Sequence, residues 1–359
     1  MQKENKTLIV LHQQGIKSHY TGAVAAAKYL GYNEIHFYEF SFIKKFFKSI
    51  LNANFSLLKK QILNCKFILS AISNPKKLDG CTIIIGMAPF DPFCALYKII
   101  SSHCRTIYHT SWHDWEEDNV PRKNFFLKRT YVKLWKEMLL DENTTVAAVT
   151  EQSKHSINQN IGTELCRIYV VGHAFDNNHQ KPQQLQKEIS IVFCGRLVKE
   201  KGVDKIISVA KKLPNVKFNI IGDGPEIKQL SKESCKNIIF FGEIKDKCKI
   251  YEVYSRCHYI MQPSIKNNKW EELFGMSIIE AMSVGVVPIT TNHIGPKEIF
   301  GHSALGVNIF SEADFEEKSI AKLISHTPST WEIESKQAVK IANNFNISSA
   351  TKKWIEILK

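Results

Sequence analysis

The sequence predicts an α/β protein built of two doubly wound domains. Three observations support this prediction: a length of 359 residues, a composition with 44% hydrophobic and 23% charged residues, and a repeated alternation of short apolar runs with helical stretches. The length is typical of two or three domains, and the composition excludes disordered, collagen-like and coiled-coil chains. Apolar runs of strand length separated by helices are typical of parallel βαβ units whose sheets are covered on both faces.

The first half of the chain carries the pattern in its simplest form. Strands are expected at 7–11, 35–38, 81–86, 105–108, 146–149 and 168–171. The segment 23–31 is expected to be a helix that ends at Gly31, and 42–63 has helical periodicity with a possible break at Asn52–Ala53–Asn54.

The second half is a clear alternating βα series, the signature of a doubly wound sheet. Strands are expected at 190–194, 216–221, 237–241, 258–262, 286–290 and 305–310. Helices are expected near 203–213, 225–234, 246–256, 275–284 and 313–325, with a final helix at 348–358.

The polar segment 176–188 separates the two halves. It contains Pro182 and lacks apolar periodicity, as interdomain linkers do. The expected organisation is a domain over 1–175, this linker, a domain over 189–340, and a helix within 341–359 that packs back on the first domain. Ligands of open α/β sheets bind outside the carboxyl ends of the strands, so two such domains are expected to face a central cleft.

The net charge of +13 is concentrated in one region. No acidic residue occurs between Glu39 and Asp79, whereas eight lysines do. Such an excess indicates nucleic acid, an anionic membrane surface or phosphorylated small molecules as partners, and no nucleic-acid module accompanies it. Apolar residues of 42–63 recur at helical spacing with lysines largely on the other side. The pattern fits a helix on an anionic membrane, and it equally fits a core-facing helix with a solvated lysine side.

Three features indicate a cytoplasmic protein. No apolar run approaches the roughly 18 residues that a membrane-spanning helix needs. The polar N-terminus shows no secretion signal. Nine cysteines without a CxxC pair favour free thiols in a reducing compartment. If 42–63 binds lipid, the protein is peripheral at the inner face of the cytoplasmic membrane.

The segment EELFGMSIIEAMSVGVVPI at 271–289 is the strongest functional signal. Glu272 precedes the entry of the helix expected here, and Glu280 lies on its second turn. A helix N-terminus between two carboxylates suits a nucleotide sugar, with hydroxyls on both sides of a diphosphate. Spacing alone fits two solvated helix glutamates equally well.

Two further motifs follow strands of the second domain. CGRLVKEKG at 194–202 places Arg196 and Lys201 at a strand's carboxyl end, where basic groups suit a diphosphate. IIGDGPE at 220–226 allows close backbone approach at Gly222 and Gly224. Taken alone, the first also fits a solvated basic loop and the second a plain tight turn.

Together and in this order, with FFGEI at 240–244, these motifs resemble the nucleotide-sugar domain of retaining glycosyltransferases of family GT4. The resemblance is dense over 188–300 and weaker toward both ends. It implies the GT-B fold, two Rossmann-like domains facing a cleft. It also implies a retaining transferase that moves a hexose-type sugar from a nucleoside diphosphate sugar to an acceptor hydroxyl. The expected pathway is bacterial surface polysaccharide, lipopolysaccharide or glycolipid assembly, with no metal or other cofactor.

The resemblance also implies roles for individual residues. Arg196 and Lys201 match the diphosphate-binding positions, Glu272 the donor-sugar contact and Glu280 the ribose contact. IYHTSWHD at 107–114 matches a strand ending in a histidine that faces the donor sugar, which is His109 here. The expected catalytic set is therefore Arg196, Lys201, Glu272 and His109. The expected donor-binding set is Gly15, Gly222, Gly242, Ile244, Leu273, Phe274, Gly275, Met276 and Glu280.

Two places depart from the family pattern, and one is the turn before the linker, which has Ala174 where the family more usually has glycine. The first loop, HQQGIKSHYTG, has Gly15 and Gly22 well separated where the family usually has paired glycines and a proline. Two alternative functions stay open: a sugar-nucleotide 2-epimerase of the same architecture and a non-catalytic nucleotide-sugar binding protein. The expected partners are a nucleotide-sugar donor, a glycan or lipid-linked glycan acceptor and an anionic membrane surface at 42–63, with no specific nucleic acid.

Overall fold

The structure is a computed structural model of the chain. It describes residues 6–13, 15–40, 43–91, 93–116, 128–161, 167–176, 178, 185, 187–267 and 270–359, and only the main chain of residues 43, 44 and 128. Most of the expected linker at 176–188 lies outside the described residues.

The chain forms two compact units. Unit 1 comprises Met1–His173 and Ala350–Lys359, and unit 2 comprises Ala174–Ser349. Most of the C-terminal helix α14 (Ile347–Leu358) therefore belongs to unit 1.

Unit 1 contains a parallel sheet with strand order β2-β1-β3-β4-β5-β6. Its strands are β1 (Thr7–His12), β2 (Glu34–Glu39), β3 (Thr82–Gly86), β4 (Arg105–Thr110), β5 (Thr144–Ala148) and β6 (Ile168–Val170). Successive side chains of β1 enter cores on opposite faces: Ile9 and Leu11 lie in one, Leu8 and Val10 in the other. Burial on both faces explains why these strands are continuous apolar runs.

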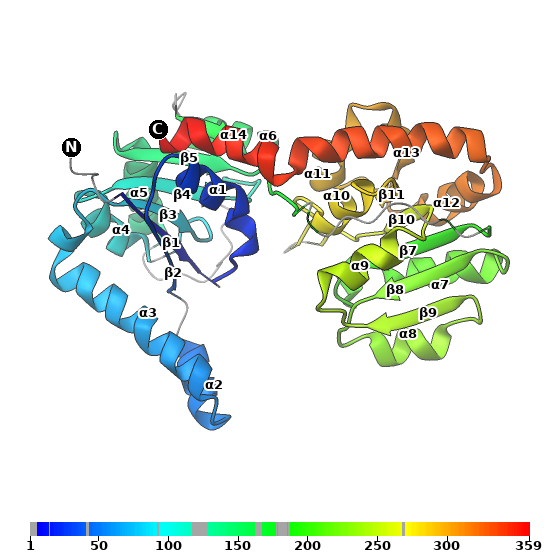
Figure 1. The fold of residues 1–359 in the computed structure, drawn as a ribbon, viewed down its shortest axis with the longest axis horizontal. Helices are drawn as coiled ribbons and strands as arrows, with labels where there is room; N and C mark the ends of the chain where they lie inside the picture. The colour runs from blue at the N-terminus through cyan, green and yellow to red at the C-terminus, as the bar shows by residue number, and fades with distance from the viewer. Residues whose placement is uncertain are drawn as a thin grey trace. The chain divides into compact units, whose positions relative to one another are not determined.

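The helices of unit 1 are α1 (Thr21–Tyr29), α2 (Ile43–Leu51), α3 (Phe55–Ser73), α4 (Cys94–Ser101), α5 (Lys128–Leu140), α6 (Glu151–Ile161) and most of α14. They lie around the sheet, except for α2 and the adjoining part of α3, which project away from it (Figure 1). α14 packs on α1 so closely that a Cβ atom on Gly22 would lie 2.7 Å from that of Ala350. Trp354 of α14 is 1% exposed and joins the alanines of α1 in one core.

The helical segment expected at 42–63 is two helices. α2 ends at Leu51, and Ala53 adopts a left-handed backbone with φ of 48°. The side chain of Asn54 accepts a hydrogen bond from the N–H of Leu57 at 3.0 Å and so caps α3. α3 then continues to Ser73, well past the expected end.

Unit 2 contains a second parallel sheet, with strand order β12-β11-β10-β7-β8-β9. Its strands are β7 (Ser190–Cys194), β8 (Lys217–Ile221), β9 (Ile238–Gly242), β10 (Tyr259–Gln262), β11 (Val287–Thr291) and β12 (Ile309–Phe310). The main helices are α7 (Val203–Lys212), α8 (Ile227–Glu233), α9 (Lys247–Tyr254), α10 (Met276–Met282), α12 (Phe315–Ile324) and α13 (Pro328–Ala342). The predicted pair of doubly wound sheets is confirmed.

Two local predictions for unit 2 need correction. The strand expected at 305–310 is a 3-10 turn, Ala304–Asn308, followed by the short β12. The chain must turn here because Ser303 caps the N–H of Leu305 at 3.2 Å, and a Cβ atom on Gly306 would meet the carbonyl oxygen of Gly301 at 2.5 Å. The sequence analysis also assigned no helix to α13, which Thr327 caps and Pro328 begins.

None of the helices in the described ranges combines the length and apolar character that crossing a bilayer requires.

Candidate functional site

The order of strands in unit 2 reverses between β7 and β10. β8 and β9 lie on one side of β7, and β10, β11 and β12 lie on the other. In open parallel sheets the crevice at such a reversal is the usual ligand site. The side-chain amide of Gln262, at the end of β10, donates 3.0 Å hydrogen bonds to the carbonyl of Cys194, at the end of β7, and to Ser277. The two strand ends are thus joined directly.

Lys201 and Glu272 form an ion pair at this reversal. Lys201 follows β7 and Glu272 follows β10, and each side chain is about one-seventh exposed, at 15% and 14%. The hydroxyl of Ser264 lies 3.4 Å from the same carboxylate, and the Lys201 ammonium lies 5.1 Å from the centre of the Trp270 ring. The loop that brings Lys201 here requires Gly202, whose φ is 62° and whose Cβ atom would lie 2.1 Å from the carbonyl oxygen of Pro263.

Arg196 lies on the same loop and is exposed. The loops after β7 and β8 are bonded together, because the N–H of Leu197 donates to the carbonyl of Asp223 at 2.9 Å. Gly222 has φ of 140°, and a Cβ atom there would stand 1.8 Å from the carbonyl oxygen of Gly195. Glycine at 222 is therefore a packing requirement of this loop pair. The N–H of Gly222 also donates to the carbonyl of Gly242 at 2.8 Å, which links this second expected donor-binding glycine to the same edge.

Glu280 is the second carboxylate of the site. It lies on α10, is 7% exposed and pairs with Lys247 at the start of α9 at 2.5 Å. Ile244, in the loop before α9, packs against the core of unit 2. Glu280 and Glu272 therefore have different lysine partners. Lys201 lies in the segment between β7 and α7, and Lys247 is the first residue of α9.

The residues before α10 form a tight entry. Gly275 caps the helix with φ of 96°, where a side chain would be strained. Phe274 is 5% exposed and its ring meets that of Phe345 at 5.6 Å, while Leu273 and Met276 are half-buried. This packing holds the main chain beside Glu272 in one place.

His109 and Gly15 belong to unit 1, at the carboxyl edge of its own sheet. His109 is the second-last residue of β4 and is 5% exposed. It lies in a histidine cluster made of His12, His19, His109 and His173. Burial lowers the pKa of His109 to about 3, and its Nε2 has no hydrogen-bond partner among the residues that the structure describes. Gly15 has φ of 71° and lies against Glu39.

Burial also lowers the pKa of the other members of the histidine cluster. The pKa of His12 falls to about 4, that of His19 falls below its ordinary value, and that of His173 falls well below it. The cluster is therefore neutral at pH 7, and its ring nitrogens can donate to or accept from hydroxyl groups. Within the described ranges, no group of three or more His, Cys, Asp or Glu side chains is arranged to hold a metal ion.

Several residues of the unit 2 site were not expected from the sequence. Lys247 pairs with Glu280, the Trp270 ring lies beside the Lys201 ammonium, and Gln262 joins β7 to β10. Gln262 could have been predicted to lie at the site, because it is the last residue of an expected strand. Lys247 gives no local signal, because its partner lies 33 positions away.

Residues 174–342 match the family model described as Glycosyl transferases group 1. The match spans just under half of the chain, and we call the matched stretch the group 1 domain. The motif resemblance is thereby confirmed, because the matched residues contain Arg196, Lys201, Glu272 and Glu280.

Curated relatives of the group 1 domain are distant. One is an uncharacterized 41.2 kDa protein in the cps region of Klebsiella pneumoniae, 26% identical over 249 residues, which are 65% of each chain. Another is a 2-deoxystreptamine N-acetyl-D-glucosaminyltransferase of Niallia circulans, 30% identical over 122 residues, or 33% of this chain and 31% of that one. The chain thus spans just under two thirds of the first relative's length and under a third of the second's.

Solved structures match over nearly the whole chain. A glycosyltransferase from Rickettsia africae has a TM-score of 0.69 at 18% identity and covers 99% of both chains. Anabaena HepE, solved in complex with UDP and glucose, has a TM-score of 0.65 at 18% identity and covers 98% of both chains. These similarities confirm the predicted GT-B fold.

Proposed function

We propose that this protein transfers a hexose-type sugar from a nucleoside diphosphate sugar to an acceptor hydroxyl with retention of anomeric configuration. The observation that carries the proposal is the pairing of Lys201 with Glu272 at the strand reversal of the group 1 domain, with Arg196 exposed on the same loop. Basic groups there suit a diphosphate, and a carboxylate suits sugar hydroxyls. Glu280 supplies a second carboxylate for ribose hydroxyls.

The chemistry follows from this charge arrangement. The bond between the anomeric carbon and the diphosphate oxygen breaks, and the acceptor oxygen bonds the same face of that carbon. The departing phosphate oxygen takes the acceptor's proton. Negative charge therefore develops on the diphosphate, where Arg196 and Lys201 stabilise it because they are in place before the reaction begins. Glu272 orients the sugar, and His109 is proposed to contact it as a neutral donor.

The proposed acceptor is a lipid-linked or surface glycan. The relative from a cps region supports a role in surface polysaccharide assembly. The lipid-linked form is supported by α2 and α3, whose shared tip carries four exposed apolar side chains: Phe47, Ile50, Leu51 and Phe55 are 60%, 52%, 84% and 79% exposed. These side chains do not form a core face. Exposed Lys48, Lys59 and Lys66 lie on the same two helices (Figure 1).

An anionic bilayer is the partner that this combination fits. Apolar side chains at the tip can enter the interface, and each lysine near an anionic surface contributes about 1 kcal/mol. The proposed attachment is reversible and peripheral. Wild-type protein should therefore sediment with vesicles containing phosphatidylglycerol at low salt and leave them near molar salt.

The vesicle experiment has a matched control. K48E/K59E/K66E should abolish sedimentation, whereas K228E/K232E/K236E makes the same charge change at exposed lysines of unit 2 and should not. Wild-type protein that stays in the supernatant at low salt would reject membrane attachment.

The transfer activity is tested in two steps. A thermal-shift panel of UDP, ADP, GDP and their sugars identifies the donor, because a ligand selective for the folded state raises its apparent stability. The stabilising donor is then incubated with glycolipid acceptors, and the anomeric configuration of the product is read by NMR. An altered sugar formed from donor alone would indicate the epimerase instead, and binding without turnover would indicate a binding protein.

A further inference from the structure

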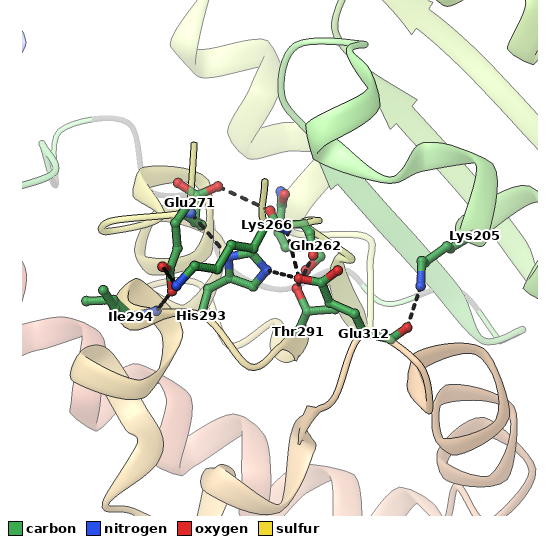
Figure 2. A network of polar contacts seen from close by, with 10 residues as sticks. Lys205, Gln262, Lys266, Glu271, Thr291, His293, Ile294 and Glu312 are labelled. Atoms are coloured by element: carbon green, nitrogen blue, oxygen red, sulfur yellow. Dashed lines mark hydrogen bonds and ion pairs between the residues drawn. The ribbon is translucent and has the colours of Figure 1, made fainter. Parts of the chain in front are cut away.

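The chain around Glu272 is held by the segment that follows β11, and Figure 2 draws His293 and Ile294 of this segment together with Glu271. The N–H of Glu272 donates to Nδ1 of His293 at 3.2 Å, and the carbonyl of Glu272 accepts from the N–H of Gly295 at 2.9 Å. The neighbouring carboxylate, Glu271, accepts from the N–H of Ile294 at 3.2 Å. Residues 293–295 thus bond to Glu271 and Glu272, and of the three bonds only that of His293 is made by a side chain of this segment.

The second ring nitrogen of His293, Nε2, faces a carboxylate. His293 is 1% exposed, and its Nε2 lies 3.2 Å from a carboxylate oxygen of Glu312, without the alignment of a hydrogen bond. Glu312 is itself held, because the same oxygen accepts from the N–H of Lys266 at 2.8 Å and its carbonyl accepts from the ammonium of Lys205. Figure 2 shows the imidazole between Glu312 and the Glu271 side of the network.

We propose that His293 is a positioning residue that holds the main chain of Glu272 as the neutral imidazole with its proton on Nε2. An imidazole nitrogen that accepts a hydrogen bond carries no proton, so the proton of neutral His293 lies on the nitrogen that faces Glu312. A carboxylate beside that N–H favours this tautomer, as carboxylates do behind metal-bound histidines. The inference rests on the proposed function, since it assigns to Glu272 the carboxylate that orients the sugar.

The consequence lies at the Lys201–Glu272 pair. The Lys201 ammonium lies 5.1 Å from the centre of the Trp270 ring. The centres of the Trp270 and His293 rings are 6.2 Å apart. Loss of the acceptor at His293 would leave the N–H of Glu272 without this bond and free its carboxylate to move. Transfer should suffer more than nucleotide binding, because the diphosphate is held by Arg196 and Lys201.

Two substitutions separate the roles of the ring nitrogens. In H293N the amide oxygen can take the place of Nδ1 and accept from Glu272, whereas in H293Q the amide reaches the place of Nε2 and leaves Glu272 without that acceptor. H293Q should lower kcat about tenfold to a hundredfold, as loss of a partner for a buried polar group does, while H293N should stay within about threefold of wild type. Both variants should bind UDP, the probe used here, as wild type does. Equal kcat in the two variants would overturn the proposal.

The tautomer is measured without substrate. Histidine labelled with ¹⁵N, with H293N used for assignment, should show the Nε2-protonated form for His293 at pH 7.5. An Nδ1-protonated ring would overturn the proposal even if the variants fold poorly. Failure of the proposed function would instead appear as wild-type protein that no nucleoside diphosphate or nucleotide sugar stabilises, with the tautomer unaffected.

Discussion

The carboxyl edges of the two sheets differ in how they carry charge. In unit 2, the segments that follow β7 and β10 carry exposed Arg196 and the Lys201–Glu272 ion pair. A second ion pair joins Lys247, at the start of α9, to Glu280 on α10. In unit 1 the strand order reverses between β1 and β3, and there the edge carries His12 and the rest of the neutral histidine cluster. The strand reversal of unit 2 therefore carries ion pairs and an exposed arginine, whereas the reversal of unit 1 carries neutral, buried or half-buried histidines. Charge in unit 1 lies at the neighbouring end of β2, where buried Glu39 pairs with Lys45.

This difference matches two kinds of ligand chemistry. Fixed charges stabilise a diphosphate that gains negative charge as it departs. Neutral histidines provide donors and acceptors for hydroxyl groups without attracting phosphate. Substitutions in unit 2 should therefore impair diphosphate binding and transfer, whereas substitutions in the histidine cluster of unit 1 should change how stability depends on pH.

Loss of Arg196 should give the largest effect. R196A removes a preorganised positive charge from the proposed leaving group and should lower kcat by about a hundredfold to a thousandfold. K199A, which removes an exposed lysine of the same loop, should leave turnover near the wild-type value. Steady-state kinetics with the donor found in the thermal-shift panel measures both. Near-normal turnover in R196A would mean that the diphosphate lies elsewhere.

The strands and the donor motifs could be predicted from the sequence because their causes are local. A strand buried on both faces is a continuous apolar run, and Arg196 and Lys201 follow such a run directly. The partners could not be predicted in this way. His293 reaches Glu272 only because β10 and β11 are neighbours in the sheet, and the sequence motif contains no sign of that contact.

The histidine cluster of unit 1 could not be predicted from the sequence for the same reason. His12 ends β1, His109 is the second-last residue of β4, His19 lies on a 3-10 helix and His173 follows β6, so only the fold brings them together. The strand expected at 305–310 was wrong for a related reason. Its apolar residues pack in a turn that the contact of Gly306 with Gly301 imposes.

Substitution of Gly222 should have the next largest effect, on stability. G222A adds a strained backbone and a clash with the carbonyl of Gly195, which together should lower the free energy of unfolding by about 3 kcal/mol or more. G31A is the matched control in unit 1, since Gly31 has φ of 83° with nothing within 4 Å of an added Cβ atom. It should cost about 1 kcal/mol from backbone strain alone. Urea denaturation measures both, and equal losses would contradict the close loop packing.

Acid should weaken the protein through the histidine cluster. Unfolded histidines have a pKa near 6.5, whereas His109 stays neutral in the folded chain down to about pH 3. The unfolded state therefore binds more protons in this window, and the stability present above pH 6.5 is lost as pH falls toward 3. Between these two pKa values, such a histidine makes the free energy of unfolding fall by about 1.4 kcal/mol for each pH unit of acidification. H109Q should reduce the slope by about that amount in urea titrations followed by tryptophan fluorescence between pH 7.5 and 4.5. An unchanged slope would show that His109 is already protonated.

Removal of Glu280 should have the smallest effect. A ribose contact binds substrate and transition state alike, so E280A should raise the KM for the donor about tenfold and leave kcat nearly unchanged. Steady-state kinetics over a range of donor concentrations separates the two parameters. A drop in kcat with donor affinity intact would instead place Glu280 in the chemical step.

The central claim is that the charged edge of unit 2 binds the diphosphate of a nucleotide sugar. Isothermal titration of UDP, ADP and GDP into wild-type protein and K201M tests it most directly. We expect one nucleotide to bind wild type and to bind K201M at least about tenfold more weakly, because Glu272 then faces the phosphates without its lysine. A nucleotide that binds both proteins equally, or no binding by any of the three, would contradict it.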